Sequence, residues 1–261
     1  MFDIEFDRVL SIGINYVGSN CELNGCINDV INLKKQLKTK SHVVLTELSQ
    51  DSKLIPTRQN IINAIKEFVS GAKSGDKMLF QYSGHGSYTL DRSGDEADRR
   101  DETICPLDYS KSGDIVDDEL RKIMVEALPE GVSLFCIFDC CHSGTVLDLR
   151  YNYRIFPRGD NKREFTIHTD NHYEKSKCRV VCFSGCNDGQ TSADAYIKGT
   201  YQGAMTWGII KSISDLNAKG KPVNYKNIMK NLLILMKNKG YTQIPQISAG
   251  HFLNLEDNLW T

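Results

Sequence analysis

The fold is decided by two short stretches, Leu79-Phe80-Gln81-Tyr82-Ser83-Gly84-His85-Gly86 and Leu134-Phe135-Cys136-Ile137-Phe138-Asp139-Cys140-Cys141-His142-Ser143-Gly144. Each begins with a strongly apolar run, which is typical of a buried strand in a parallel sheet. Each run leads into glycines that flank a histidine in one case and a cysteine in the other. Chemistry collects at the carboxyl ends of such strands. The two stretches therefore predict a cysteine nucleophile beside a histidine base.

Strands and helices are expected to alternate along most of the chain. Apolar runs predict strands over 9–16, 43–45, 77–82, 133–138, 179–184 and 246–248. Helical periodicity predicts helices over 28–37, from a Thr57 cap to about 69, over 116–128 with Asp114 as cap, and over 203–216 and 224–239. This order predicts an α/β fold whose mostly parallel central sheet carries helices on both faces. Residues 91–102 are crowded with charge and 148–178 are polar without a period, so both are expected to be long surface loops.

The composition narrows the class of protein further. The 261 residues carry a net charge of −1, which gives no reason to expect nucleic acid or a membrane surface as partner. No apolar run approaches the roughly 18 residues that span a bilayer. The acidic N-terminus is not a signal peptide, and nine cysteines without one indicate a reducing, cytoplasmic setting.

Further motifs extend along the chain: Gly13-Ile14-Asn15-Tyr16, Leu23-Asn24-Gly25-Cys26-Ile27-Asn28-Asp29-Val30, Ile115-Val116-Asp117-Asp118-Glu119-Leu120, Ser184-Gly185-Cys186-Asn187-Asp188-Gly189-Gln190-Thr191-Ser192-Ala193-Asp194 and Gly203-Ala204-Met205-Thr206. With the two stretches above, they resemble the metacaspases of the caspase–hemoglobinase clan of cysteine proteases. The resemblance is to a compact type I member without its prodomain. It implies a caspase-like three-layer sandwich as a single domain over 1–261. Its larger part would end near 147, a linker would cover about 148–178, and a smaller part would begin near 179.

The resemblance also assigns the catalytic groups. It aligns Cys141 with the nucleophile and His85 with the base, and the sequence offers no third residue that would orient the histidine. The backbone N–H of Gly86, together with that of Cys141, is expected to stabilise the oxyanion. Successive strand side chains point to opposite faces, so only one of Cys140 and Cys141 can face the cleft.

Substrate preference is expected to follow from charge. The resemblance places Cys26, Asp29, Ser83 and Asp139 around the pocket for the residue before the scissile bond. The caspase pattern has Gln where this chain has Asp139. Two carboxylates in that pocket would favour Arg or Lys and repel Asp. The alternative is that Asp29 merely begins a helix, where a carboxylate interacts favourably with the helix dipole.

A calcium site is also implied by the resemblance. Asp101, Asp117, Asp118 and Asp148 match four aspartates that bind Ca²⁺ in metacaspases, and carboxylate oxygens are the ligands that Ca²⁺ prefers. The chain has no EF-hand spacing, so the residues alone favour no calcium site. The alternative is a solvated acidic surface with helix-start carboxylates at Asp117 and Asp118.

The sequence therefore predicts a calcium-activated, monomeric cysteine endopeptidase that cleaves protein substrates after Arg or Lys. Self-cleavage is expected within the basic segment that holds Arg150, Arg154, Arg158, Lys162, Arg163, Lys175 and Lys177. One alternative is a catalytically silent interaction protein whose cleft is covered by aromatic side chains, among Phe6, Tyr16, Tyr88 and Tyr151. Asp139 disfavours an Asp-specific enzyme, and the adjacent cysteines lack the C-x-x-C spacing of a redox protein.

Overall fold

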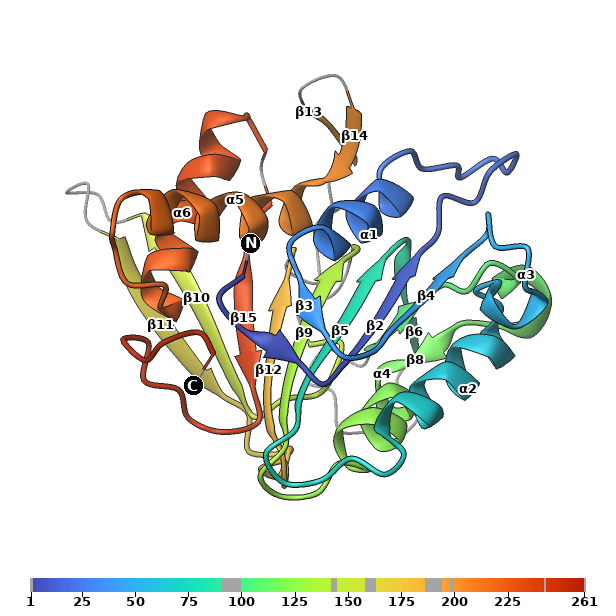
Figure 1. The fold of residues 1–261 in the computed structure, drawn as a ribbon, viewed down its shortest axis with the longest axis horizontal. Coiled ribbons are helices and arrows are strands. Elements are labelled where there is room, and N and C mark those ends of the chain that lie inside the picture. The colour runs from blue at the N-terminus through green and yellow to red at the C-terminus, as the bar shows by residue number, and fades with distance from the viewer. Residues whose placement is uncertain are drawn as a thin grey trace.

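An eight-stranded sheet forms the centre of the molecule (Figure 1). A computed structural model describes residues 2–90, 100–141, 145–157, 163–185, 194–197, 200–241 and 243–260. The strand order is β11 (Arg163–Thr169), β10 (Tyr151–Pro157), β15 (Gln246–Ala249), β12 (Arg179–Ser184), β9 (Ser133–Asp139), β5 (Lys77–Ser83), β2 (Arg8–Gly13) and β4 (His42–Thr46). The strands from β12 to β4 run parallel, whereas β15, β10 and β11 each pair antiparallel with their neighbours.

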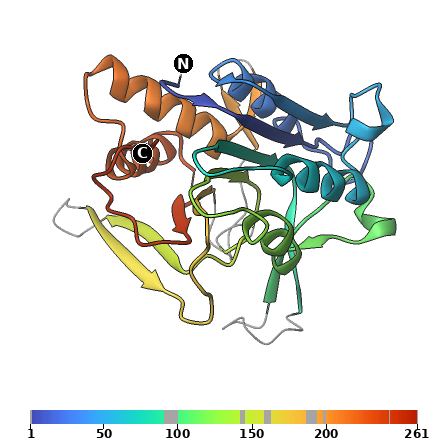
Figure 2. The same ribbon diagram turned by 60° about the horizontal axis from the view of Figure 1, so that its bottom comes forward.

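Helices cover both faces of this sheet (Figures 1 and 2). One face carries α1 (Cys26–Lys34), α5 (Ala204–Ala218) and α6 (Tyr225–Asn238), and the other carries α2 (Arg58–Val69), α4 (Asp117–Leu120) and the π-helical turn η2 (Arg121–Val125). Alternate strand residues feed the two cores: Leu79 and Phe135 pack with α5 and α6, whereas Phe80 and Cys136 pack with α2 and η2. The expected three-layer caspase-like sandwich is confirmed.

Local capping explains where the helices begin. The Thr57 hydroxyl accepts the Asn60 N–H at the start of α2, as the sequence predicts. The prediction that Asp114 caps a helix from 116 is wrong. Its carboxylate accepts a hydrogen bond from the Thr103 hydroxyl at 3.1 Å, and β8 (Ile115–Val116) intervenes before α4 begins at Asp117.

The expectation of a long loop over 148–178 is also wrong. Strands β10 and β11 form an antiparallel hairpin that extends the sheet beyond β15. Tyr153 and Ile155 alternate with more polar residues and are buried against the α5 and α6 side, which is the period of a strand with one buried face. The Tyr153 hydroxyl accepts the Leu253 N–H at 2.6 Å and ties the hairpin to the C-terminal segment.

The charged segment expected to be a loop is partly a strand as well. Residues 100–102 belong to β7 (Arg100–Ile104), which pairs with β6 (Gly86–Leu90) and β8, whereas 91–99 lie outside the described residues. The remaining elements are short: β1 (Glu5–Phe6), β3 (Lys38–Thr39), η1 (Ser52–Leu54), α3 (Tyr109–Ser112), β13 (Asp194–Ile197) and β14 (Thr200–Gly203).

None of the helices in the described ranges combines the length and apolar character needed to cross a lipid bilayer. The eight cysteines within those ranges are all free thiols.

Candidate active site

His85 and Cys141 leave the sheet from equivalent positions on neighbouring strands. β5 and β9 are adjacent and parallel, with Ser83 opposite Asp139 as their last paired residues. Both strands point toward the same upper edge in Figure 1. The Gly84 N–H donates to the Asp139 carbonyl at 3.4 Å, so the two chains are still in contact as they leave the sheet. His85 and Cys141 each lie two residues beyond the last pair.

Gly86 allows these two segments to lie against each other. A Cβ atom at Gly86 would lie 2.0 Å from the Cys141 carbonyl oxygen and 3.2 Å from the Cys140 sulfur. No side chain fits there without displacing the backbone of Cys141. The glycine predicted to serve the oxyanion is thus also the residue that permits the close approach of the histidine and cysteine segments.

The thiols at the end of β9 are clearly distinguished by burial. Cys140 is fully buried in the core on the α2 side, whereas Cys141 is partly exposed. Burial raises the pKa of Cys178 to about 11 and that of Cys182 to about 12, so both thiols stay protonated near neutral pH. Among the described cysteines only Cys141 and Cys21 are even partly exposed, and Cys141 is the one at a strand end.

A backbone carbonyl orients the imidazole of His85. Its Nε2 atom lies 2.7 Å from the Cys21 carbonyl oxygen, in the loop between β2 and α1. A carbonyl only accepts hydrogen bonds, so Nε2 carries the proton and Nδ1 of the neutral ring keeps its lone pair. This is the third group that the sequence did not reveal. No residue type encodes a backbone carbonyl, so no sequence pattern could have indicated it.

The two predicted pocket carboxylates lie together at the start of α5. The Gly203 N–H donates to Asp29 Oδ1 at 2.8 Å, and the Thr206 N–H donates to Asp139 Oδ2 at 2.7 Å. A Cβ atom at Gly203 would lie 2.3 Å from Asp139 Oδ2 and 2.5 Å from Asp29 Oδ2, so the carboxylates are immediate neighbours. Asp29 is 1% and Asp139 4% exposed. The positive end of the α5 dipole therefore faces a buried pair of carboxylates.

The other two predicted pocket residues lie at the same end of the sheet. Ser83 is buried, is paired with Asp139, and accepts the Ile14 N–H on its carbonyl at 3.0 Å. Cys26 is the first residue of α1 and is buried one helical turn before Asp29. Asp29 does lie in the first turn of α1, but its carboxylate accepts a hydrogen bond from Gly203, the N-cap of α5, rather than only serving its own helix. The involvement of Gly203 and Thr206 was not expected from the residues themselves.

The four aspartates expected to bind calcium differ in their exposure to solvent. Asp101, Asp117 and Asp148 are buried, whereas Asp118 is exposed. The Asp117 carboxylate accepts the N–H groups of Glu102 at 2.5 Å and Asp118 at 2.8 Å. Within the described ranges, no three His, Cys, Asp or Glu side chains gather closely enough to hold a metal ion. The calcium site stays a prediction.

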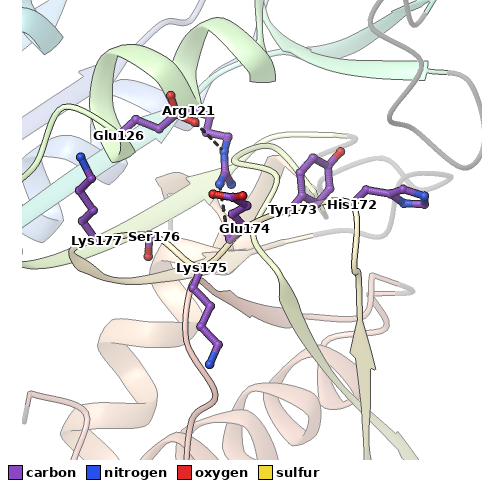
Figure 3. A pocket seen from close by; sticks show the side chains of 8 residues that line it. All are labelled: Arg121, Glu126, His172, Tyr173, Glu174, Lys175, Ser176 and Lys177. Atoms are coloured by element: carbon purple, nitrogen blue, oxygen red, sulfur yellow. Dashed lines mark hydrogen bonds and ion pairs between the residues drawn. The ribbon is translucent and has the colours of Figure 1, made fainter.

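The pocket in Figure 3, of about 450 Å³, contains none of the residues predicted to carry the chemistry. Its Arg121 side chain donates to the carbonyls of Asp148 and Glu174 and forms an ion pair with Glu126 at 3.2 Å. Arg121 thereby joins η2 to the segment that follows Cys141 and to the segment that precedes β12. The pocket is lined by Arg121, Glu126, His172, Tyr173, Glu174, Lys175, Ser176 and Lys177.

Two of the four aromatic residues considered as a cover for the cleft, Phe6 and Tyr151, pack elsewhere in the fold. Phe6 is buried against Phe135 on the α5 and α6 side of the sheet. Tyr151 packs against Phe252, with ring centroids 6.0 Å apart. Tyr16 is buried against the imidazole of His85, and Tyr88 is exposed with Arg100 over its ring.

A histidine and a partly exposed cysteine at the ends of neighbouring strands, in a sheet covered by helices on both faces, define a caspase-like cysteine peptidase. Residues 7–150 match the family model of the metacaspase peptidase C14 domain. Metacaspase-1 of Mycosarcoma maydis is 38% identical, with 95% of this chain and 71% of that protein covered. Metacaspase-1 of Meyerozyma guilliermondii is 35% identical, with 94% and 69% covered. The chain belongs to the metacaspase family and is a cysteine-type endopeptidase by membership.

Solved structures agree on the fold. Protein GSU0716 from Geobacter sulfurreducens superimposes with a TM-score of 0.66 at 23% identity, covering 98% of both chains. Caspase-1 from Spodoptera frugiperda gives 0.51 at 11% identity, covering 94% of this chain and 87% of that one. The family resemblance expected from the sequence is confirmed. The monomeric state and the cytoplasmic location stay predictions.

Proposed function

We propose that this metacaspase cleaves peptide bonds after Arg or Lys, with Cys141 as nucleophile and His85 as base. The observation that carries the proposal is the position of Asp139 at the end of β9, two residues before Cys141 and beside Asp29. A guanidinium or ammonium group would neutralise two neighbouring buried carboxylates, whereas an Asp side chain would be repelled. A cationic substrate side chain therefore accounts for two neighbouring carboxylates, one of which lies two residues before the nucleophile.

The proposed chemistry follows from the orientation of His85. Nδ1 takes the proton of Cys141, and the thiolate attacks the carbonyl carbon before the scissile bond. The imidazolium then protonates the leaving amine, while its Nε2–H remains on the Cys21 carbonyl. Water gives a proton to the same nitrogen and attacks the acyl carbon; the C–S bond breaks, and the released Cys141 thiolate takes that proton back from the imidazolium. The N–H groups of Gly86 and Cys141 are the proposed oxyanion donors, each worth on the order of 10²–10³ in rate.

Hydrolysis of matched fluorogenic peptides that end in Arg, Lys or Asp tests this proposal. Arg and Lys peptides are expected to be cleaved and the Asp peptide to be left intact, because only the first two carry a charge opposite to that of the pocket. Cleavage of the Asp peptide would contradict the pocket assignment. Failure of all three peptides to react, with Cys141 open to a thiol-directed peptide probe, would favour the silent alternative.

Calcium dependence is proposed on the family resemblance alone, since no three His, Cys, Asp or Glu side chains of the described residues lie close enough together to hold a metal ion. The same assay is to be run with calcium and with chelator. If calcium binds after the segments carrying Asp117 and Asp148 rearrange, Asp117→Asn is expected to raise the calcium concentration needed for half-maximal rate by about 10-fold or more. An unchanged rate in chelator would remove calcium from the proposal without affecting the catalytic groups.

Self-cleavage is proposed after Lys175 or Lys177 among the described basic residues of the segment. Arg154 lies within β10, which is paired on both sides, and its guanidinium donates to Gln246. Arg150 donates to the Tyr173 carbonyl and to Asn171. Lys175 and Lys177 are exposed in an irregular segment, where a protease can take the chain in extended form. Arg158 and Lys162 lie outside the described residues, as does the side chain of Arg163.

Mass spectrometry of the active enzyme after prolonged incubation identifies the cut bond. Fragments ending at Lys175 or Lys177 are expected, and the double variant Lys175→Gln, Lys177→Gln is expected to stay intact at those bonds. Fragments that end at Arg150 or Arg154 would show that β10 leaves the sheet, and would contradict the assignment. The variant Cys141→Ala is the control for contaminating proteases.

A further inference from the structure

The backbone of His85 is held by two buried tyrosine hydroxyls. Tyr16 Oη accepts the His85 N–H at 3.0 Å, and Tyr82 Oη donates to the His85 carbonyl at 2.8 Å. The Cys105 N–H donates to the same carbonyl at 3.1 Å. Both backbone polar groups of His85 are therefore hydrogen-bonded, and one of the partners is a side chain of β5, the strand that leads to His85. These contacts fix the position of the His85 backbone, and therefore the point from which its imidazole side chain extends.

The two hydroxyls belong to one network. They lie 3.2 Å apart, and Tyr16 Oη donates to the Cys105 carbonyl at 2.6 Å. Burial raises the pKa of both tyrosines well above the ordinary value, so both hydroxyls keep their protons. A Cβ atom at Gly84 would lie 2.7 Å from Tyr82 Oη and 3.0 Å from Tyr16 Oη. Gly84 thus leaves room for the network immediately before His85.

Tyr16 also touches the catalytic side chain. Its ring lies against the imidazole of His85, with centroids 4.7 Å apart and planes inclined by 37°. The loop that begins at Tyr16 continues to Cys21, whose carbonyl accepts the Nε2–H. One loop therefore fixes the backbone, one ring face and one nitrogen of His85. The nitrogen left for proton transfer is Nδ1.

Glu47 fixes the start of this loop. The Tyr16 backbone has φ of +53°, in the left-handed region that a bulky residue rarely adopts. The Glu47 carboxylate, just beyond the end of β4, accepts the N–H of Tyr16 at 2.9 Å and that of Val17 at 3.2 Å. Two hydrogen bonds to one carboxylate offset the cost of that conformation. Glu47 does so from the residue that directly follows β4, the edge strand of the parallel half of the sheet.

We propose that Tyr16 is a positioning residue for His85, and that Glu47 acts on the same histidine through the backbone of Tyr16. Neither residue touches the scissile bond. Each serves to hold Nδ1 where it can exchange a proton with Cys141. The inference rests on the proposed role of His85 as catalytic base.

Steady-state kinetics of Tyr16→Phe and Glu47→Gln on an Arg peptide test the inference. Tyr16→Phe keeps the ring against the imidazole but removes the acceptor for the His85 N–H. A misplaced base is expected to lower kcat on the order of 10- to 100-fold, with KM changed less than about threefold because the pocket is untouched. Glu47→Gln removes the charge and one acceptor, and is expected to lower kcat in the same way but less.

Tyr225→Phe is the matched control. Tyr225 is fully buried, and its hydroxyl also accepts one hydrogen bond, from Arg179 at 2.6 Å, and donates another, to the Leu259 carbonyl at 3.1 Å. It lies on α6, and loss of its hydroxyl is expected to lower the melting temperature about as much as Tyr16→Phe while leaving kcat unchanged. Rates are referred to the concentration of reactive Cys141, titrated with an irreversible thiol-directed peptide.

The kinetics separate the positioning role of Tyr16 from the catalytic role of His85. Parental kcat in Tyr16→Phe, or an equal loss of kcat in Tyr225→Phe, overturns the positioning role. If Tyr16→Phe does not fold, the kcat and KM of Glu47→Gln decide, because that variant keeps the tyrosine network. Full activity of His85→Ala would instead refute the proposed catalytic base.

Discussion

Replacing Cys141 with alanine is expected to abolish peptide hydrolysis, lowering kcat/KM by at least about 10⁴-fold. The other thiols on β9 and β12 are not expected to replace it, because Cys136, Cys178 and Cys182 are buried in the core and desolvation raises the pKa of each. Binding is expected to survive, because the carboxylates of Asp29 and Asp139 are unaffected. The first measurement is hydrolysis of an Arg peptide by the variant. The second is the rate of the parent enzyme in the presence of excess variant, which is expected to fall because the inactive variant still binds the substrate.

Cys140→Ala is the control that the chain itself provides. Cys140 precedes Cys141 and carries the same thiol, but its side chain is buried in the core on the α2 side. Its replacement is expected to cost some stability through a small cavity and to leave kcat near the parental value. Loss of turnover in Cys140→Ala, with retention in Cys141→Ala, would reverse the assignment of the nucleophile.

The sequence predicts this part of the site well because it depends on strand ends. Apolar runs locate β5 and β9, and parallel neighbours bring their carboxyl ends to one edge. His85 and Cys141 are read from that argument alone, and the resemblance adds which of the two adjacent cysteines is the nucleophile. The sandwich follows equally from the alternation of strands and helices. These features are local in sequence or follow from a general rule of topology.

The features missed by sequence reasoning depend on contacts between distant backbone groups. The Cys21 carbonyl that orients His85 is indifferent to the side chain at position 21. The Asp29 and Asp139 carboxylates accept the N–H groups of Gly203 and Thr206 at the start of α5, 174 and 67 residues away along the chain. The β10 and β11 hairpin was missed because polar residues conceal the alternation of Tyr153 and Ile155 with their neighbours. Tyr153 and Ile155 become buried only because β10 pairs with β15, a strand almost 100 residues further along the chain.

Replacing Asp139 with asparagine is expected to lower kcat/KM for an Arg peptide by about 10²–10³-fold, because one partner of a buried, charge-assisted pair is lost. A peptide with citrulline in place of Arg gives the sharper readout, since citrulline has the shape of Arg without its charge. The parent is expected to prefer Arg strongly. The preference is expected to fall toward unity in Asp139→Asn, and Asp29→Asn is expected to do the same.

Stability distinguishes this role from a purely structural one. If the two carboxylates only satisfied the N-terminus of α5, their removal would lower the free energy of unfolding and leave the Arg-to-citrulline ratio unchanged. If they form the pocket, the Arg-to-citrulline ratio falls whatever happens to the stability, because the two neighbouring carboxylates are what distinguishes the charged side chain from the neutral one. Asp139→Asn still offers an amide oxygen to the Thr206 N–H. We therefore expect the variant to lose its preference for Arg while its melting temperature changes little, whereas loss of a cap alone would lower the melting temperature and leave the preference intact.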